Sequence, residues 1–570
     1  MPEQKPMVAN CHYKNIFYYC SIVLLLILFF FNCATSIREK SNTWDESGHL
    51  LAGYAFLKEG IDYLEPSHPP TGRSFSSVPL LFFDVKSDLK SILPSIINGS
   101  NFYPYSLQFL FENSVDGKTL LFWSRIPNII LGVILGLYIF VWAKEVFGKK
   151  GAFLSLFLYS FCPNILANAE LITTDFPLTA FFFMASFHLY RLSKEQRPLQ
   201  ILASGLTIGL LLTSKYTGLF ILPSLVCLLG LLAAKESGSI VIKRKIGCKY
   251  LLLLISILAI AYVTIWAVYG FQYRPNIATG PWIEISYGQN KALTNWPILP
   301  ESYLYGLTKL FHRSQGGHPA FLLGEYSTQG WWYYFITAFM LKTPIPAVIL
   351  FLTFFVCFKK YPKEYPTIVL SILPVAIFFI ITSMQNINIG IRHILPVYPF
   401  IYLLTGGLCS IKFKRQRLIK YAFTGLMLWY GYNAYSIYPH HLAFFNELTG
   451  GPKNGYKYLV DSNLDWGQDL PGLKKYMEQN NIKKVNLSYF GLSNPGYYDI
   501  DYNYLPSNAI FQTPDQAASA KSMNETRIFA ISATMLQGVY SENRNFYGFF
   551  KNLTPVEKIG YSIFIYSLEP

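Results

Sequence analysis

Long apolar segments separated by short polar ones fill the chain up to about residue 438. Several of them, including 16–36 and 251–269, approach or exceed the roughly 20 apolar residues that a helix needs to cross a bilayer. The pattern predicts about eleven transmembrane helices, over 16–36, 120–143, 152–169, 176–190, 200–214, 217–233, 251–270, 332–357, 367–383, 394–410 and 420–438. Segments 200–214 and 217–233 are short and are separated by little more than Lys215, so one kinked hairpin is the alternative there.

Basic residues gather in alternate loops between these segments. The clusters lie within 144–150, 191–197, 235–249, 359–363 and 412–420. Because cytoplasmic loops carry an excess of Lys and Arg, these loops and the N-terminus, with Lys5 and Lys14, are predicted to be cytoplasmic. The opposite loops then face outward, the largest over 37–119 and 271–331, together with everything after residue 438.

The chain after residue 438 has a different pattern. A polar helical stretch, Leu470–Asn480, is followed by apolar runs of strand length at Val485–Tyr489, Ile528–Ile531 and Ser562–Tyr566. Alternation of this kind predicts a small α/β domain. The predicted fold class is therefore a polytopic α-helical membrane protein, with a transmembrane domain over 1–438 and a soluble extracytoplasmic α/β domain over 439–570.

The composition agrees with this class. Only 14 % of the residues are charged, whereas a soluble domain averages about 25 %. The net charge of +15 comes from the separate loop clusters, so nucleic acid is not an expected partner. The eight cysteines lie in or beside apolar segments or, for Cys248, in a basic loop, so we expect no disulfide scaffold and no zinc site. The first apolar segment has no signal-cleavage pattern and is interpreted as an uncleaved span.

Two carboxylates, Asp45 and Glu46, follow Trp44 directly after the first predicted span. Carboxylates just outside a bilayer can take a proton from a substrate arriving by water while a second substrate arrives by lipid. The alternative is a helix cap, for which Asp is a good residue type. His68 follows in the same loop, before two prolines that fix an extended backbone and can hold the histidine against the membrane surface. The alternative is an ordinary rigid loop in which His68 has no function.

Further ionisable residues lie at predicted outer ends of spans, where charge near lipid is costly and tends to serve function. Asp175 stands in a short turn and is interpreted as a helix cap and as a site residue converging with Asp45, two roles that can coexist. Lys215 ends one predicted span, and Arg392 and His393 precede another, where a cation commonly snorkels. Lys342 lies within an apolar stretch that two prolines break, and we expect it to face an anionic ligand such as a lipid phosphate.

One further motif fails as a metal site. Residues 461–465, Asp-Ser-Asn-Leu-Asp, begin like a calcium-binding loop, but Trp466 replaces the turn glycine and Gly472 stands at the twelfth position. No P-loop, nucleophile elbow or dinucleotide fingerprint occurs in the sequence. No metal ligands and no cofactor are predicted, although the need for a divalent metal is left open.

Six segments together resemble a known family. They are WDESGHLLAGYAFLKEG, HPP, TTDFPLTAFF, LLTSKYTGLFILP, WWYYFITAFMLKTPIP and IRHILPVYPF, within about residues 40–410. The chain resembles GT-C-type glycosyltransferases of the dolichyl-phosphate-mannose protein mannosyltransferase and aminoarabinose transferase superfamily, in its bacterial form. The tail, with DSNLDWGQDL, resembles the soluble domain attached to many bacterial members and lacks the beta-trefoil region of the eukaryotic protein mannosyltransferases.

The resemblance implies a function and roles for the candidate residues. Such enzymes transfer a sugar, with inversion, from a polyprenyl-phosphate carrier to an acceptor outside the cytoplasm. Asp45 would be the base, Glu46 its neighbour and Asp175 the second acidic residue. The remaining candidates would bind substrate, namely His68, Lys215, Lys342, Arg392 and His393. Expected partners are the lipid-linked donor, membrane lipid, and an acceptor protein, lipid or glycan.

The expected location is the cytoplasmic (inner) membrane, with the N-terminus in the cytoplasm and the C-terminal domain in the periplasm. A transporter or flippase of lipid-linked saccharide is the alternative function. That alternative explains the spans and buried cations equally well, but not the clustered outer carboxylates or the attached soluble domain. A non-enzymatic envelope scaffold is the third possibility, and only the tail domain supports it.

Overall fold

The computed structural model describes residues 5–62, 64–87, 89, 101–236, 240–273, 298–361, 365–411, 416–506 and 526–568. For 5–14, 240–244, 365–367 and 416 it describes the backbone alone. Parts of the predicted basic loops, 237–239, 362–364 and 412–415, and of the predicted outer loops, 63, 88, 90–100 and 274–297, lie outside the described residues.

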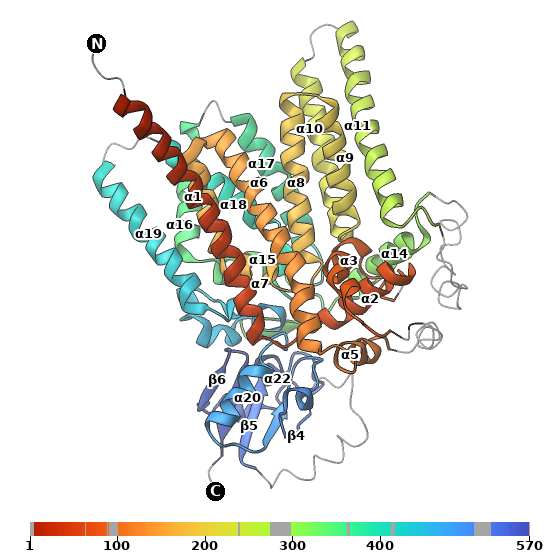
Figure 1. Ribbon diagram of the computed structural model, residues 1–570, viewed down its shortest axis with the longest axis vertical. Coiled ribbons are helices and arrows are strands. Elements are labelled where there is room, and N and C mark those ends of the chain that lie inside the picture. The colour runs from red at the N-terminus through yellow and green to blue at the C-terminus, as the bar shows by residue number, and fades with distance from the viewer. Residues whose placement is uncertain are drawn as a thin grey trace.

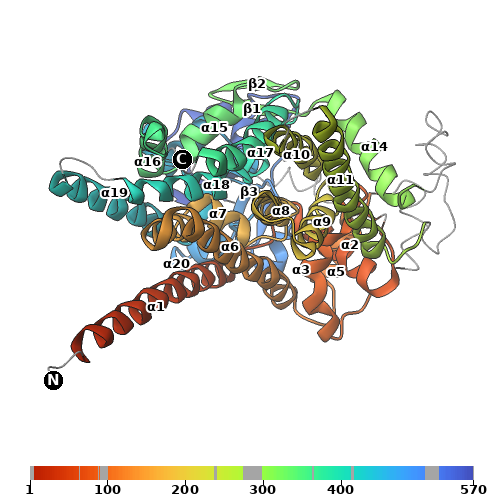
Figure 2. The ribbon, with the colours of Figure 1, turned by 90° about the horizontal axis from the view of Figure 1, so that it is seen from above.

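Helices occupy every apolar range that the sequence predicts, and they stand side by side as a bundle (Figure 1). Their bounds are α1 Lys5–Ser36, α6 Gly117–Ser160, α7 Pro163–Ala169, α8 Asp175–Lys194, α9 Pro198–Leu212, α10 Ile221–Glu236, α11 Ile240–Val268, α15 Tyr334–Lys342, α16 Ile345–Val356, α17 Tyr365–Ser383, α18 Val397–Thr405 and α19 Gln416–Ile437. Seen from above, α6 and α8 lie in the interior of the bundle, whereas α1, α11 and α19 lie toward its edge (Figure 2).

Four described helices are long and apolar enough to cross a membrane. They span Asn15–Glu39, Gly117–Ser160, Tyr216–Glu236 and Lys245–Val268. The pair α15 and α16 is a fifth crossing if counted together, but the two helices meet at 115°. The segment predicted over 332–357 is thus two helices, and the break lies at Pro344 and Pro346, the two prolines expected to interrupt it. The number of eleven spans stays a prediction.

The predicted basic loop at 144–150 is a tight break within α6. Gly148 has a φ of 71°, a left-handed conformation that favours glycine, and the helix reverses there. The second half of α6 ends at Ser160, and the short α7 follows after a further break. The span predicted over 152–169 is thus two helical pieces. The seven cysteines that the structure describes are all unpaired.

Four helices from the two large outer loops cluster at one end of the bundle (Figure 1). These are α2 Glu46–Glu59, α3 Pro70–Ser77, α5 Tyr103–Phe111 and α14 Glu301–Gly316. Helices α2 and α5 share a buried apolar cluster with the 3₁₀ turn Val78–Phe82 and the start of α6, and it includes Leu50, Leu80, Leu110 and Leu120. The outer-loop segments are therefore folded against one another, so that residues near the start of α2 have a fixed place.

A five-stranded sheet lies at the same end of the bundle. Its strands are β3 Val485–Ser488, β4 Tyr502–Tyr504, β5 Ile528–Ser532, β6 Glu557–Ile559 and β7 Ile563–Ser567, in the order β4-β3-β5-β7-β6. Strand β3 runs parallel to β4 and β5, and β7 runs antiparallel to β5 and β6. Helix α20, Leu470–Gln479, packs Leu473 against Val485 and Ile565 in a common core. The three predicted strands and the predicted helix are confirmed.

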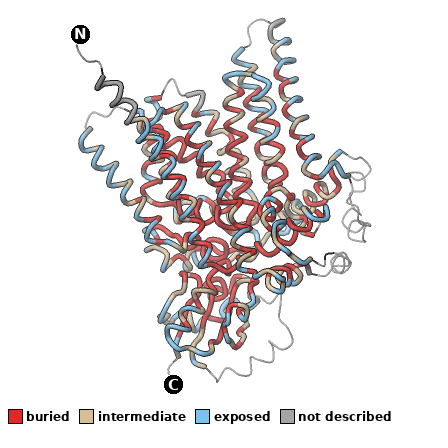
Figure 3. The backbone as a smooth tube through the Cα atoms, viewed as in Figure 1, coloured by how far each residue is buried: buried red, intermediate tan, exposed pale blue. Residues whose placement is uncertain are grey.

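The C-terminal region is packed onto the helical bundle rather than tethered to it. One apolar cluster runs from Ile22 in α1 to Phe564 in β7, and the buried residues are continuous across the junction (Figure 3). The backbone also connects the two parts, since Ser41 N–H donates to Gln468 O at 2.9 Å. Helix α19 ends at Ile437, and the division of the chain into two domains near residue 439 stays a prediction.

Candidate functional site

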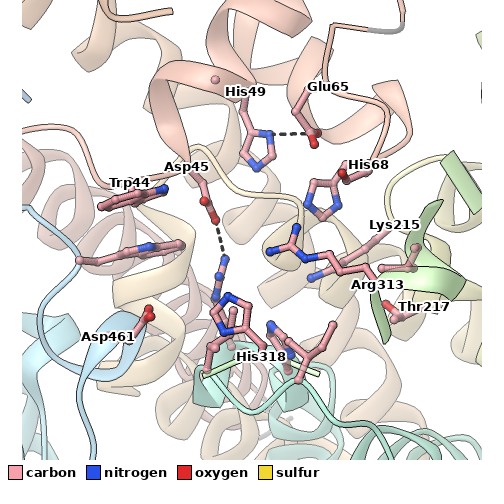
Figure 4. A pocket seen from close by; sticks show the side chains of 18 of the residues that line it. Trp44, Asp45, His49, Glu65, His68, Lys215, Thr217, Arg313, His318 and Asp461 are labelled. Atoms are coloured by element: carbon pink, nitrogen blue, oxygen red, sulfur yellow. Dashed lines mark hydrogen bonds and ion pairs between the residues drawn. The ribbon is translucent and has the colours of Figure 1, made fainter. Parts of the chain in front are cut away.

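A cavity of about 480 Å³ lies where the bundle, the outer-loop helices and the C-terminal region meet. Figure 4 shows Asp45, His68 and Lys215 around it. Arg392 and His393 also line it, from the 3₁₀ turn Ile391–Ile394 before α18. Five of the eight candidate residues, far apart in the sequence, therefore meet in one cavity.

Asp45 occupies the N-cap position of α2, but its side chain makes no capping hydrogen bond. Instead, Asp45 Oδ2 accepts from Arg392 Nη1 at 2.9 Å. The Asp45 side chain is 22 % exposed, compared with 1 % for Asp175. The helix-cap alternative is thus contradicted for Asp45, and its carboxylate is the accessible one of the two.

Asp175 is the first residue of α8 and binds two cations. Lys215 Nζ donates to Asp175 Oδ1 at 2.5 Å, and Arg392 Nη1 lies 3.4 Å from Asp175 Oδ2. The preceding Thr174 is the N-cap residue, and it too makes no side-chain capping bond. The capping role is wrong here as well, because both oxygens of Asp175 are used in ion pairs. Arg392 bridges the two carboxylates and brings α2 and α8 together.

The charges of these groups follow from burial and from their neighbours. Burial opposes the charge of Arg392, but Asp45, Asp175 and Asp461 outweigh that effect and raise its pKa, so the guanidinium stays charged. Burial holds the pKa of His68 and that of His393 well below the usual range, and the nearby cation Lys215 lowers both further. Both imidazoles are therefore neutral at pH 7 and can each donate one hydrogen bond and accept one.

Glu46 is not among the residues that line the cavity. Its carboxylate is fully buried and receives two hydrogen bonds from Arg125, at 2.8 and 2.6 Å. The backbone N–H groups of Thr43 and Ile172 donate to the same carboxylate at 2.7 and 2.9 Å. All of these contacts are internal, so the geometry gives Glu46 the task of fixing the start of α2 and not a contact with substrate.

Lys342 does not line the cavity either. Its Nζ is buried and donates to two backbone carbonyls, those of Leu442 at 2.7 Å and Asn463 at 2.5 Å. The ammonium also lies 4.5 Å from the centre of the Phe445 ring. The anion-facing position expected of Lys342 is therefore not observed. Its contacts join α15 to the C-terminal region.

Sequence reasoning missed most of the residues that line the cavity. His49 and Glu65 flank His68, with His49 Nδ1 4.0 Å from Glu65 Oε2, and Arg313 and His318 come from α14 and the segment after it. The signal for His49 was its place one helical turn after Asp45. Nothing in the sequence singles out Arg313 or His318, because they follow residues 274–297 in a loop without a recognisable motif.

Four further lining residues come from the C-terminal region, namely Asp461, Trp466, Phe490 and Tyr540. Burial raises the pKa of Asp461, although Tyr540, which donates to Asp461 Oδ2, opposes that shift. Asp461 and Trp466 belong to the DSNLDWGQDL segment, which the sequence excluded as a calcium loop and which was assigned to the soluble domain without a role in the site. In the part of the chain that the structure describes, no group of three or more His, Cys, Asp and Glu side chains could hold a metal ion.

Comparisons with known proteins found one matching family model and several similar solved structures. Residues 112–266 match the family model described as dolichyl-phosphate-mannose-protein mannosyltransferase. Among curated proteins, none matches the chain. The protein O-mannosyltransferase Pmt1-Pmt2 complex of S. cerevisiae, solved with its sugar donor, has 11 % identity and a TM-score of 0.51. That alignment covers 75 % of this chain and 90 % of the yeast chain.

Two other solved structures align over most of the chain. ArnT from Cupriavidus metallidurans, bound to undecaprenyl phosphate, has 12 % identity and a TM-score of 0.49, over 96 % of this chain and 97 % of its own. The oligosaccharyltransferase AglB from Archaeoglobus fulgidus has 13 % identity and a TM-score of 0.41, over 93 % of this chain and 72 % of its own. At 11 % identity, the likeness to the yeast complex shows a shared fold alone. Residues 112–266 thus match the dolichyl-phosphate-mannose-protein mannosyltransferase family, and the chain is an integral membrane protein with a fold similar to that of GT-C glycosyltransferases.

Proposed function

We propose that the protein transfers a sugar, with inversion, from a polyprenyl-phosphate-linked donor to an acceptor hydroxyl, with Asp45 as general base. One observation carries the proposal. An accessible carboxylate, Asp45, shares a cavity with two cations, Lys215 and Arg392, which both form ion pairs with Asp175. A base for the acceptor and positive charge for a phosphate leaving group are what such a transfer needs.

Asp45 is the carboxylate best placed to accept the proton. Its Oδ2 is held by Arg392, and within the described residues its Oδ1 has no hydrogen-bond partner. An acceptor hydroxyl would bond to this free oxygen and transfer its proton there as the hydroxyl oxygen attacks the anomeric carbon. The new carbon–oxygen bond forms as the bond from that carbon to the phosphate oxygen breaks. Attack opposite the leaving phosphate inverts the anomeric centre.

Lys215 and Arg392 would stabilise the charge on the departing phosphate. An ammonium has three donors and a guanidinium five, so each can keep Asp175 and still bind an anion. Arg392 Nε is buried without a hydrogen-bond partner among the described residues and is free for such a contact. Arg313, His68 and His393 line the same cavity and would add further donors. Phosphate needs no protonation to leave, so one base suffices.

The apolar part of the cavity suits the lipid portion of the donor. Leu178 on α8, Leu310 on α14, and Ile387 and Ile389 after α17 line it. A polyprenyl chain would pass between these helices into the bilayer while its phosphate stays at the cations. The name of the matching family, which uses dolichyl-phosphate mannose, and the donor bound in the yeast complex support a donor of this class.

The proposed orientation places the cavity and the C-terminal region outside the cytoplasm. It rests on the alternation of the basic loops, with the N-terminus cytoplasmic and the protein in the inner membrane. The acceptor is a protein, lipid or glycan hydroxyl that reaches Asp45 from the aqueous side. The polar lining residues on that side, His49, Glu65 and Tyr103, would contact it.

The test uses purified protein in nanodiscs and radiolabelled polyprenyl-phosphate sugars, each offered with candidate acceptors. The proposal expects labelled acceptor to appear together with an equal amount of free polyprenyl phosphate, and the product to have the inverted anomeric configuration by NMR. Lipid binding and movement of intact donor across the bilayer, without release of polyprenyl phosphate, would contradict transfer and support a transporter.

A further inference from the structure

We infer that Trp466, a residue of the C-terminal region, is a positioning residue of the transferase site that holds Arg392 and Asp45 together. The inference rests on the proposed function and adds to it a role for the region after α19. It is carried by contacts of two different parts of Trp466, its indole ring and its backbone carbonyl.

The ring of Trp466 supports the arginine. Arg392 Cζ lies 4.2 Å from the ring centre, and Trp466 is only 2 % exposed. A guanidinium over an indole face is attracted by the ring quadrupole, and the attraction is larger where water is excluded. The same guanidinium forms ion pairs with Asp45 and Asp175. The ring therefore supports the guanidinium at the place where its Nη1 meets both carboxylates.

The carbonyl of Trp466 supports the base. Trp44 N–H donates to Trp466 O at 3.0 Å, and Trp44 directly precedes Asp45. Ser41 N–H donates to Gln468 O at 2.9 Å, so two residues before α2 are bonded to the same short segment. Trp466 thus contacts Arg392 directly and contacts Asp45's neighbour Trp44, although Asp45 and Arg392 are 347 positions apart.

Trp466 is itself anchored from two sides. The backbone N–H of Trp466 donates to Gln468 Oε1 at 2.8 Å. The preceding Asp465 accepts from the backbone N–H of Thr534, which follows strand β5, at 2.8 Å. On the other side, Asp469 Oδ1 accepts from Lys40 Nζ at 2.5 Å. The segment from Asp465 to Asp469 is therefore fastened both to the sheet and to the stretch that leads into α2.

This arrangement makes the C-terminal region part of the site. Reacting groups must be held closely, because a misplacement of about 1 Å can lower the rate by as much as 10²-fold. Trp466 contacts Arg392 and the residue before Asp45, Phe490 stacks on Trp44, and Asp461 and Tyr540 line the cavity beside them. The site is incomplete without residues 461–469.

The first test replaces the ring and leaves the carbonyl. Trp466→Leu is expected to lower kcat about 10- to 100-fold, because Arg392 loses its support, whereas Trp466→Phe keeps an aromatic face and most of the rate. Trp142→Leu is the matched control. Trp142 is also fully buried, but it stacks on Tyr190 in the bundle and does not line the cavity. It should lose thermal stability and keep kcat. A kcat of Trp466→Leu no lower than that of Trp142→Leu would overturn the inference.

A double-mutant cycle tests whether Trp466 acts through Arg392. In an Arg392→Gln background, Trp466→Leu should cause no further loss of kcat, while independent, multiplying losses would overturn the inference. The same four proteins are compared in thermal unfolding, which needs no turnover. Additive shifts in Tm would show that the two side chains do not interact and would also overturn it. Absence of transfer by the wild type contradicts the proposed function instead, so the two failures are distinguishable.

Discussion

Asp45 and Glu46 are adjacent in the sequence, yet their carboxylates bind different arginines in different surroundings. Asp45 pairs with Arg392 at the cavity, at 2.9 Å, and Glu46 pairs with Arg125 in the core, at 2.6 Å. The start of α2 separates the two side chains, since Asp45 is the N-cap residue and Glu46 the first of the helix. One acid is therefore available for chemistry, and its neighbour holds the helix that presents it.

Glu46→Gln is expected to destabilise the protein strongly. The substitution leaves Arg125 buried without its charge partner, and breaking a buried ion pair costs about 3–5 kcal/mol. Thermal unfolding in detergent should show a large drop in Tm for Glu46→Gln and almost none for Asp45→Asn, whose side chain is partly exposed. Equal drops for the two variants would contradict the division of roles.

Lys215 and Lys342 should also differ, the first in donor binding and the second in stability. Lys215→Met removes a donor to the proposed phosphate site and is expected to raise the donor KM about tenfold or more, since a hydrogen bond to a charged group is worth about 1.5–3 kcal/mol. Lys342→Met removes a cation that holds only backbone carbonyls. It should lower Tm and leave the donor KM of the folded protein unchanged. A donor titration decides, and a raised KM in Lys342→Met would restore the anion-binding role that its position in the sequence predicted.

The pH dependence of stability should reveal Asp465. Burial raises the pKa of Asp465 to about 7, and its Oδ1 has no partner among the described residues. The folded protein then holds a proton that the unfolded chain releases near pH 4, so the contribution to stability is full below that pH and is lost as pH rises through 7. Asp465→Asn mimics the protonated acid. Its Tm should exceed that of the wild type by a margin that grows between about pH 4 and pH 7 and stays constant above that.

Asp469 is the matched control for that experiment. Burial opposes its charge, but Lys40 and His440 outweigh this and lower its pKa. Its contribution to stability depends on pH in the opposite direction: it is present above the unfolded pKa and is lost as the pH falls through the folded pKa. Asp469→Asn should lower Tm at neutral pH without the rising difference expected for Asp465→Asn. Parallel Tm curves for wild type and Asp465→Asn would show that Asp465 is ionised in the folded protein.

The fold could be predicted from sequence wherever one local pattern decides. Apolar runs such as 16–36 produced helices, and Val485–Tyr489 produced a strand, because burial in lipid or in a sheet core selects these runs directly. Asp45, Asp175 and Lys215 were identified from their places beside predicted spans. The alternation of basic loops with outward-facing loops places all three at the same membrane face. This alternation can be recognised in the sequence without knowledge of any tertiary contact.

Other features depend on tertiary contacts that leave no local pattern. Asp45 and Glu46 look alike in sequence, and only the direction of α2 separates them. The ammonium of Lys342 donates to backbone carbonyls, and no side-chain motif in the sequence predicts these contacts. Trp466 made the DSNLDWGQDL segment fail as a calcium loop, and the same tryptophan is the residue that supports Arg392. The segment lines the cavity because its backbone is bonded to residues 41 and 44 before α2 and Asp465 is bonded to Thr534 after β5.

The most direct test of the proposed function compares wild type with Asp45→Asn in nanodiscs, with radiolabelled polyprenyl-phosphate sugar as donor. Asn keeps the size of Asp and accepts a hydrogen bond from Arg392 but cannot accept the proton. The wild type should transfer label to an acceptor hydroxyl and release polyprenyl phosphate. Asp45→Asn, at equal abundance and Tm, should bind the donor and transfer at least 100-fold more slowly, within the about 10²–10⁴-fold that general base catalysis contributes. Equal transfer by the two proteins would contradict Asp45 as the base.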